Sequence, residues 1–343
     1  LWLGGGDPSL LTRLGDRPFL LIKELSSLLE GNPYGRGDIY AQLREVYDGS
    51  YAREYGNGVR RSWKGKAAVI IGITPAIDRH RAFDSQLGER CLKIRFNALP
   101  GRALEDLAYD TISNIGQEGK VRQALHTAYE QAITEATACV ERVRLSDDTR
   151  HRVACLATFA ATVRTHVERN QYASGNPVIL PPAPELPHRI VKNLHLVAIA
   201  LTALRGDTEL YDVKLIERIA FDCMPEPRRS ILKRLITYGR EGTKLTVNDF
   251  TDIVSESAVR MALEDLRLLS LVLKEDGDGP SSCLGGKPPS TYILSPTAER
   301  WLRQGGVSAQ KSKGEGVKKK TEVPLESGEE TPGDNRTDSR SAA

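Results

Sequence analysis

The sequence predicts a protein of mixed α/β class, with an α/β region first, helical regions second and a small unit of helices and strands third. Two short apolar runs, at 19–22 and 67–73, have the length and composition of buried strands. Apolar residues recur at helical spacing through 102–170, where proline does not occur. After position 305 the chain is rich in Gly, Ser, Glu and Lys, which predicts a disordered tail over 305–343.

Composition limits the function classes that need to be considered. The 343 residues are 40% hydrophobic, enough for two or three domains with apolar cores. A formal net charge of +3 excludes a polycation, so any nucleic-acid contact must come from local basic patches. Five scattered cysteines without a CxxC pair exclude a disulfide scaffold or a zinc ribbon and indicate buried thiols in a reducing cytosol. No His or Cys spacing predicts a metal site.

The sequence was also searched for membrane-spanning and secretory segments. No apolar run reaches the length of a transmembrane helix and no secretory signal is visible, so we expect a cytoplasmic protein without a membrane partner. The chain opens with Leu1-Trp2-Leu3 rather than Met, and we interpret it as a fragment of a longer protein.

The first region has the pattern of two parallel strands joined by a crossover. The runs at 19–22 and 67–73 flank an amphipathic segment, 38–47, and such an order predicts a parallel sheet covered on both faces. Between that segment and the second strand, Asn57-Gly58 is the strongest short signal for a hairpin turn.

The expected hairpin is basic. Cations bind phosphates and aromatic faces stack on bases, so a hairpin carrying both predicts contact with nucleic acid. Tyr51, Tyr55 and Trp63 are the aromatic residues. The cations are Arg53, Arg60, Arg61, Lys64 and Lys66. The alternative is a solvated basic loop on a globular protein.

The later regions are divided by proline and by turn signals. A proline cluster at 177–187 separates two helical blocks and predicts a linker. The last unit has three predicted helices, a strand near 271–274 and a return strand at 291–294, an order typical of a winged helix. The expected boundaries are 1–101, 102–176, 177–224, 225–304 and 305–343.

Short polar residues predict where helices of the last unit begin. Thr246 can cap the second helix, Ser255 or Ser257 the third, and Ser295-Pro296 the final one. The winged unit also offers candidates for DNA contact, and phosphate positioning is the expected role because the third helix is not strongly basic. These candidates are Arg228, Arg229, Lys233, Ser257 and Arg260. Winged helices also bind proteins, which is the alternative.

A half-complete nucleotide site is the main chemical prediction. The sequence contains no GxxxxGK[ST], so it supplies no phosphate-cradling loop. The strand at 19–22 is followed by Lys23 and Glu24, and ligands bind at such strand ends. A carboxylate there can hold magnesium or orient an attacking water, which makes Glu24 the candidate. The alternative is a surface Lys/Glu pair after a core strand.

The order of these elements resembles the second half of an AAA+ ATPase module. A strand with a polar pair, a helix, a hairpin and a strand ending at Thr74-Pro75 resembles the minichromosome maintenance helicases. The run is also similar to a set of bacterial and phage ATP-binding proteins, which share the segments at 7–11, 47–49, 74–79 and 87–90. The resemblance covers 5–100 and extends more weakly through the helical blocks. Lys23 departs from the family pattern, in which that position is acidic.

The resemblance implies a role for each candidate and a set of partners. Glu24 and Lys23 would stand at the Walker B position, Thr74 at sensor 1, and Arg189, in a lid helix, at sensor 2. Arg90 would be the arginine finger that acts on ATP of the neighbouring subunit. ATP and Mg²⁺ would be the cofactors, and DNA and further copies of the chain the partners. Several alternatives stay open: Thr74 as a strand cap, Arg90 paired with a carboxylate, and Arg189 as a plain exposed arginine. Arg79 and Arg81 are further candidates for the arginine finger.

The function expected from these features is that of a DNA-associated AAA+ ATPase fragment. It would belong to a helicase or DNA-remodelling motor of phage or mobile-element replication, with ATP bound between subunits. The fragment alone is expected to be inactive because the phosphate loop is missing. The alternative is a non-catalytic DNA-binding regulator with a winged helix on a degenerate AAA+ scaffold, and Lys23 favours it.

Overall fold

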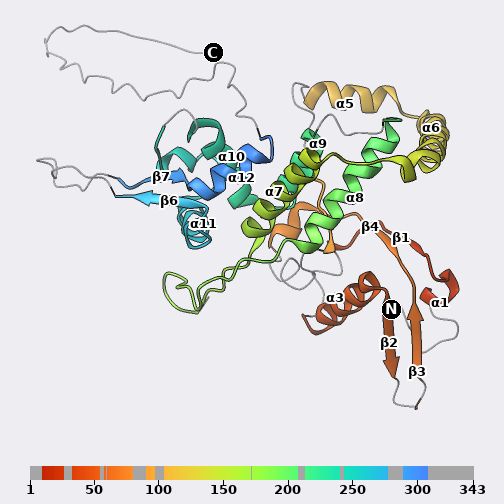
Figure 1. Ribbon diagram of the computed structural model, residues 1–343, viewed down its shortest axis with the longest axis horizontal. Helices are drawn as coiled ribbons and strands as arrows, with labels where there is room; N and C mark the ends of the chain where they lie inside the picture. The colour runs from red at the N-terminus through yellow and green to blue at the C-terminus, as the bar shows by residue number, and fades with distance from the viewer. Residues whose placement is uncertain are drawn as a thin grey trace, which may run out of the picture. The chain divides into compact units, whose positions relative to one another are not determined.

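In the computed structural model, all described residues lie in one compact unit, Leu1–Ala309. Helices dominate, and the described strands form three small sheets (Figure 1), so the predicted mixed α/β class is confirmed. The described residues are 10–26, 33–54, 58, 60–79, 90–96, 104–170, 172–207, 213–239, 243–276 and 289–307.

The N-terminal part contains a two-stranded parallel sheet. Strand β1 (Phe19–Ile22) pairs in parallel with β4 (Ala68–Ile71), with Phe19 opposite Ala68 and Ile22 opposite Ile71. The parallel pairing predicted from the sequence is confirmed. Between the two strands the chain forms α3 (Pro33–Asp48) and an antiparallel hairpin, whereas the short helix α1 (Leu10–Leu14) precedes them. The 3₁₀ helix η1 (Pro75–Arg79) follows β4.

The prediction that this sheet is covered on both faces is wrong for the described residues. Leu20 is buried against Leu43 of α3 and its neighbours, but Phe19 and Leu21 are 63% and 59% exposed. In β4, Ile70 is 54% exposed. Successive side chains of a strand point to opposite faces, so one apolar face of the sheet packs on the core and the other remains uncovered.

The hairpin of β2 (Ser50–Glu54) and β3 (Arg60–Lys64) is confirmed, and α3 lies beside β2 (Figure 1). Gly58 has a φ of 77° at the predicted turn, a conformation that favours glycine. At the other end, the Trp63 indole N–H donates to the Gly15 carbonyl at 2.8 Å. A Cβ on Gly65 would lie 2.2 Å from the Asp16 carbonyl oxygen, so only glycine allows this close approach.

The helical part is built around α7, which is buried along most of its length. Ser146 caps α7 by accepting a hydrogen bond from the Thr149 N–H, and α7 packs against α8, α9 and α12. The predicted linker at 177–187 contains no helix, and its only strand-like contact is a bridge between Arg169 and Val178. The helices are α5 (Leu104–Ser113), α6 (Glu118–Cys139), η3 (Val140–Arg142), α7 (Asp147–Arg164), α8 (His188–Leu204) and α9 (Lys214–Asp222).

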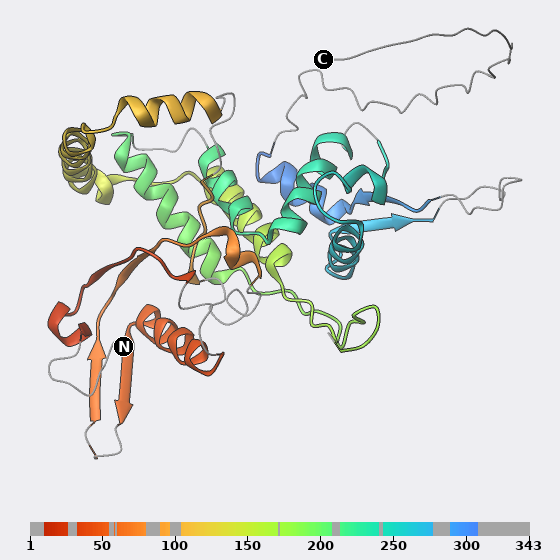
Figure 2. The ribbon, with the colours of Figure 1, turned by 180° about the vertical axis from the view of Figure 1, so that it is seen from behind.

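The last part has the predicted order of helices and strands. A short strand that the sequence analysis did not predict, β5, makes the sheet three-stranded in the order β5-β7-β6. Figure 2 shows the strands of this part, in blue, beside its helices. Thr246 and Asp249 form a reciprocal capping box, and Ser295 caps the final helix through the Ala298 N–H. The elements are α10 (Glu226–Gly239), β5 (Leu245–Thr246), η4 (Val247–Phe250), α11 (Glu256–Leu268), β6 (Val272–Glu275), β7 (Thr291–Leu294) and α12 (Pro296–Gln304).

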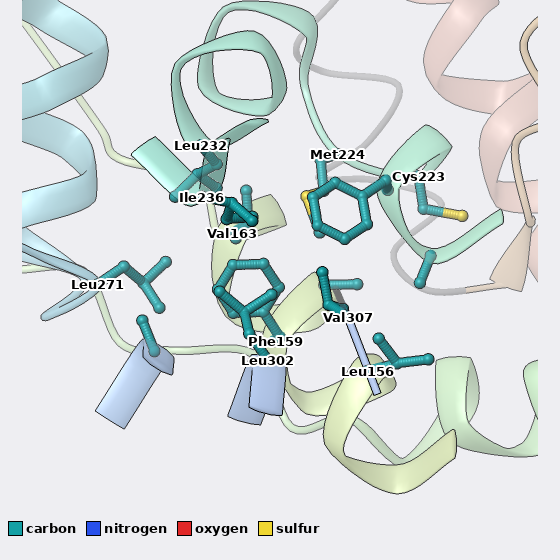
Figure 3. Close-up of a cluster of buried hydrophobic side chains, with 14 of the residues drawn as sticks. Leu156, Phe159, Val163, Cys223, Met224, Leu232, Ile236, Leu271, Leu302 and Val307 are labelled. Carbon is teal, nitrogen blue, oxygen red and sulfur yellow. The ribbon is translucent and has the colours of Figure 1, made fainter. Parts of the chain in front are cut away.

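One apolar core extends across the expected boundaries at 176 and 224. Phe159 of α7 is fully buried and lies 6.0 Å, centroid to centroid, from Phe221 of α9. Figure 3 shows Phe159 beside Leu302, and the same core contains Val307. The tail prediction is therefore wrong for 305–307, because Val307 is buried and its N–H bonds to the Leu302 carbonyl. The remaining tail, 308–343, lies outside the described residues.

Truncating Phe159 tests whether these helices share one cooperative core. We expect Phe159→Ala to lower the free energy of unfolding by about 3–5 kcal/mol, because it removes a buried ring and leaves a cavity. Denaturant unfolding of the purified protein measures it. Arg150→Ala, at an exposed position on the same helix, is the control and should change stability by less than about 0.5 kcal/mol. A loss below about 1 kcal/mol for Phe159→Ala would contradict the shared core.

Candidate functional site

The carboxyl ends of β1 and β4 bring together Glu24 and Thr74, which lie far apart in the sequence. Gly72 N–H donates to the Ile22 carbonyl at 2.8 Å, so the strands stay paired up to their ends. Beyond them, Ser26 N–H donates to Glu24 Oε1 at 2.6 Å, and the hydroxyls of Ser26 and Thr74 lie 2.8 Å apart. Ser26 therefore links the two predicted residues into one cluster.

Ser26 was missed by the sequence analysis. No pattern marks it, because its role depends on the Thr74 hydroxyl, 48 positions later, to which it bonds. Its two hydrogen bonds to Glu24, from the side chain and from the backbone, lower the pKa of that carboxyl group. Glu24 is exposed and ionised at neutral pH, and Lys23 beside it is exposed too.

Gly72 sets the spacing of this cluster. An added Cβ would lie 2.3 Å from the Lys23 carbonyl oxygen, closer than real Cβ contacts come. The backbone after β4 therefore passes directly against the backbone after β1, and Thr74 reaches Ser26 because of this approach.

The side chains of Glu24, Ser26 and Thr74 offer oxygen atoms as possible ligands. Magnesium prefers oxygen ligands and is bound through one or two carboxylates, with substrate phosphates and water completing its shell. Glu24 supplies a carboxylate, and the hydroxyls of Ser26 and Thr74 are adjacent. Among the described residues, no group of three or more His, Cys, Asp or Glu side chains is placed so that it could hold a metal ion.

Arg90 is held within the chain by an ion pair. Its Nη2 lies 2.8 Å from Asp48 Oδ2, and its guanidinium lies over the Tyr47 ring, 5.9 Å from the centroid. The Arg90 side chain is only 12% exposed. Asn193 of α8 accepts from the Tyr47 hydroxyl and donates to the Arg90 carbonyl. This arrangement is the carboxylate pairing left open by the sequence, and it ties the end of α3 to α8.

Arg189 is exposed in the first turn of α8. It precedes Asn193 by four residues, so both lie on one face of the helix. Since Asn193 contacts Tyr47, that face is the one directed at the end of α3.

A second partly buried arginine, Arg95, joins the α/β part to the helices, and the sequence gave no signal for it. The guanidinium of Arg95 makes two hydrogen bonds to the Asp78 carboxylate, at 2.6 and 2.8 Å. Its backbone N–H donates to Asp222 of α9 at 3.0 Å. The bonds to Asp78 raise the pKa of Arg95 further above its usual value, so it is a permanent cation.

The basic hairpin has its cations exposed but its aromatic residues buried. Tyr51 and Trp63 are opposite each other and 6% exposed, packed at the foot of the hairpin. The prediction that these two rings stack on bases is therefore wrong, because the core already covers them. Tyr55 lies outside the described residues.

The cations point to both faces of the hairpin. Arg53 lies directly opposite Arg61, and Arg60 lies opposite Glu54. Like charges placed opposite each other across a ladder repel, and Arg53 and Arg61 concentrate positive charge on one face of the hairpin. Four of the predicted cations, Arg53, Arg60, Lys64 and Lys66, are exposed, and Arg61 is half-buried.

Two of the predicted DNA-binding residues are buried, and their assignment is wrong. Arg228 is 7% exposed and donates to the Val163 and Thr165 carbonyls, each at 2.7 Å, and to Asp265 at 2.8 Å. The last carbonyls of a helix have no partner within it, and Arg228 binds them at the end of α7.

Arg229 is 6% exposed and pairs with Asp222 and Glu226. Sequence alone could not distinguish a basic surface from arginines that bind buried acids, because the acids come from other helices or from one turn away. Arg169 is a further arginine whose side chain is buried, and it pairs with Glu264 and Asp265 of α11.

The other candidates of this part are exposed. Ser257 and Arg260 lie on the exposed side of α11, where Arg260 pairs with Glu256, and Lys233 is exposed on α10. Desolvation, followed by the nearby charge of Arg229, lowers the pKa of Lys233. A groove between α11 and the strands is lined by Arg260, Leu263, Glu264, Arg267, Lys274, Asp276 and Tyr292. Lys274 of β6 was missed because only the packing of strand on helix brings it beside Arg260.

Comparison with known proteins gives no assignment of its own. No family model matches the sequence, and no curated protein matches it. Within the described part of the chain, no helix combines the length and apolarity needed to cross a bilayer. The geometry of the residues above is therefore what any functional assignment rests on.

Arg228 and Arg260 provide a test that separates a structural arginine from a surface arginine. We expect Arg228→Ala to lower the free energy of unfolding by about 1–3 kcal/mol, because it leaves two buried carbonyls at the end of α7 without their donor, while Asp265 keeps Arg169 as a partner. Arg260→Ala should change stability by less than about 0.5 kcal/mol, since its ion pair is exposed. Thermal and denaturant unfolding of both variants measure the difference, and equal stabilities would contradict the assignment.

Proposed function

We propose that the chain is part of a DNA-associated AAA+ ATPase that moves or remodels DNA. The observation that carries this proposal is the cluster of Glu24, Ser26 and Thr74 at the carboxyl ends of two paired parallel strands. In open α/β sheets such strand ends are where ligands bind. The basic hairpin, to which we assign nucleic-acid contact, lies between the same two strands in the sequence. The proposed ATP site and the proposed DNA contact are therefore carried by one continuous segment.

Each residue of the cluster has a role that its geometry supports. Glu24 is a carboxylate kept ionised by hydrogen bonds from Ser26, so it can accept a hydrogen bond from an attacking water. Thr74 presents a hydroxyl oriented by the same serine. Mg²⁺, held by Glu24 together with phosphate and water, would neutralise charge on the phosphates. Lys23 places a second positive charge beside this point.

A complete nucleotide site needs a phosphate-binding loop from another polypeptide segment, because these 343 residues contain no GxxxxGK[ST]. The uncovered apolar face of the sheet supports this part of the proposal. Phe19, Leu21 and Ile70 are exposed there, and parallel sheets are stable when both faces are covered. Further α/β elements packed on this face would bring a phosphate loop to the same strand ends.

Arg90 can act as the proposed arginine finger only if it gives up its present partners. To act on a nucleotide of a neighbouring subunit, its guanidinium must leave Asp48 and Tyr47. Arg189 on α8 is already exposed, on the face that contacts Tyr47. Subunit contact at the end of α3 would therefore reach both arginines, because Asn193 links that end to Arg90 and α8.

The C-terminal part supports DNA binding by a winged helix. Three helices, α10, η4 and α11, are followed by the antiparallel strands β6 and β7, with β5 completing the sheet. In such units the third helix contacts the duplex. Here Arg260 and Arg267 on α11 and Lys274 on β6 line one groove, and cations in that position bind phosphates rather than read bases.

The second candidate function is a non-catalytic DNA-binding regulator on the same scaffold. Two observations favour it: Lys23 stands where the family has an acid, and Arg90 already has a partner within its own chain. Such a protein would bind DNA without hydrolysing ATP.

ATP hydrolysis by the full-length protein distinguishes the two candidates. We expect DNA-stimulated hydrolysis that falls about a hundredfold in Glu24→Gln, which removes the charge but keeps the shape, and that also falls in Arg90→Ala. Glu45→Gln changes an exposed carboxylate on α3 and is the control. A wild-type protein that binds DNA but does not hydrolyse ATP would favour the regulator.

Salt dependence of DNA binding tests the groove beside α11. Each phosphate contact that is lost should reduce the slope of log K against log salt by about 1, so Arg260→Ala with Lys274→Ala should reduce it by about 2. Fluorescence anisotropy at several salt concentrations measures the slope. Arg303→Ala on α12 is the matched control, and an unchanged slope in the double variant would exclude this surface.

A further inference from the structure

The chain between α7 and α8 contains a second hairpin. Its two sides are joined by backbone hydrogen bonds of 2.9 Å, from the Asn170 N–H to the Pro177 carbonyl and from the Ile179 N–H to the Glu168 carbonyl. Figure 1 shows this segment, in yellow-green, extending away from the neighbouring helices. We call residues 168–170 and 172–179 the α7–α8 hairpin.

The tip of the α7–α8 hairpin is a defined turn that carries one large side chain. The Tyr172 N–H donates to the Asn170 side-chain oxygen at 3.0 Å, and the Asn176 N–H donates to the Ala173 carbonyl at 3.1 Å. Gly175 and Asn176 have φ angles of 77° and 48°, the left-handed conformation that reverses the chain here. Tyr172 itself is fully exposed. The turn therefore presents an aromatic ring to solvent.

Arg169 fixes the base of the α7–α8 hairpin to α11. Its side chain is 5% exposed, and its Nη1 donates across the hairpin to the Asn176 carbonyl at 3.0 Å. Its Nη2 donates to Asp265 at 2.6 Å and to Glu264 at 2.9 Å. One guanidinium has donors enough for all three contacts, because its five N–H groups form a rigid fork. The hairpin is therefore held at one place on the side of α11.

Glu264, the partner of Arg169, belongs to the groove between α11 and the strands. It follows Arg260 by four residues and precedes Arg267 by three, so the three side chains share one face of the helix, and all three line the groove. A carboxylate between two arginines would repel a phosphate, and the ion pair with Arg169 offsets its charge. The α7–α8 hairpin thus begins at the edge of the surface that we propose for DNA phosphates.

The chemistry of the tip fits a base rather than a phosphate. From 170 to 180 the sequence contains no Asp, Glu, Lys or Arg, so the tip has neither a carboxylate to repel a phosphate nor a cation to attract one. Its largest group is the ring of Tyr172, and aromatic rings bind nucleic acid by stacking on bases. Bases inside a duplex are covered by their neighbours, so the ring can stack only on an unpaired or terminal base. The matching ligand is a duplex with a single-stranded extension.

We propose that the α7–α8 hairpin is a further DNA-contacting element, in which Tyr172 stacks on an unpaired base next to a duplex held along α11. The inference rests on the proposed DNA binding by the C-terminal part and adds to it the form of DNA that is bound. It does not depend on ATP hydrolysis.

Binding of the full chain to a blunt duplex, and to the same duplex with a single-stranded thymine extension on either strand, tests the role of Tyr172. By fluorescence anisotropy at fixed salt, we expect the wild type to bind an extended duplex about tenfold more tightly, the scale of stacking on one base. Tyr172→Ala should remove this preference and leave the affinity for the blunt duplex unchanged, because the groove at α11 is not altered. Its thermal midpoint should not change, since the side chain is fully exposed. Tyr172→Phe keeps the ring and should behave like the wild type, as should the control Ser174→Ala at the same tip.

A fluorescent adenine analogue at the first unpaired position separates stacking from general contact. Its emission falls when an aromatic ring stacks on it, so we expect quenching by the wild type and by Tyr172→Phe, but not by Tyr172→Ala.

The outcomes separate this inference from the proposed DNA binding. Equal affinity of the wild type for blunt and extended duplexes, a preference that survives Tyr172→Ala, or its loss in Tyr172→Phe or Ser174→Ala would each overturn the role of the ring. Each would leave DNA binding at α11 standing, and the tip would then be assigned to a protein partner. A wild type that binds none of these DNAs would overturn both the inference and the proposed DNA binding.

Discussion

Burial of α7 is the constraint on which most of the described chain depends. The helix packs against α8, α9 and α12, and the ring of Phe159 lies within the shared core. The carbonyls at the C-terminal end of α7 would be costly to bury without hydrogen-bond donors. Arg228 donates to two of them, and it also pairs with Asp265 of α11. Arg228, which the sequence analysis assigned to DNA contact, therefore attaches the C-terminal part of the fold, from α10 to α12, to the central helices.

The site depends on a different constraint, the parallel pairing of β1 and β4. Because both strands end at the same edge, residues 50 positions apart meet through the hydroxyl of Ser26. Gly72 allows the approach, since any side chain there would collide with the Lys23 carbonyl. The cluster is thus built from backbone geometry first, and the chemistry of Glu24 and Thr74 follows from where that geometry places them.

Two apolar surfaces differ from the rest of the molecule in lacking a cover among the described residues. One face of the parallel sheet exposes Phe19, Leu21 and Ile70, and helices α5 and α6 expose large apolar side chains along their lengths. The sheet face lies on the strands whose ends hold Glu24 and Thr74, whereas only the C-terminal end of α6 packs against α8.

Local pattern by itself determined the two parallel strands, the hairpin, the caps at Thr246 and Ser295 and the order of elements in the C-terminal part, because short apolar runs, Asn57-Gly58 and Ser295-Pro296 act through neighbours in sequence. Only the tertiary structure decided which cations are available. Arg228 and Arg260 have the same side chain, yet one is buried against the carbonyls of α7 and the other is exposed. Burial depends on contacts between residues that the fold brings together from distant segments, and composition does not specify these contacts.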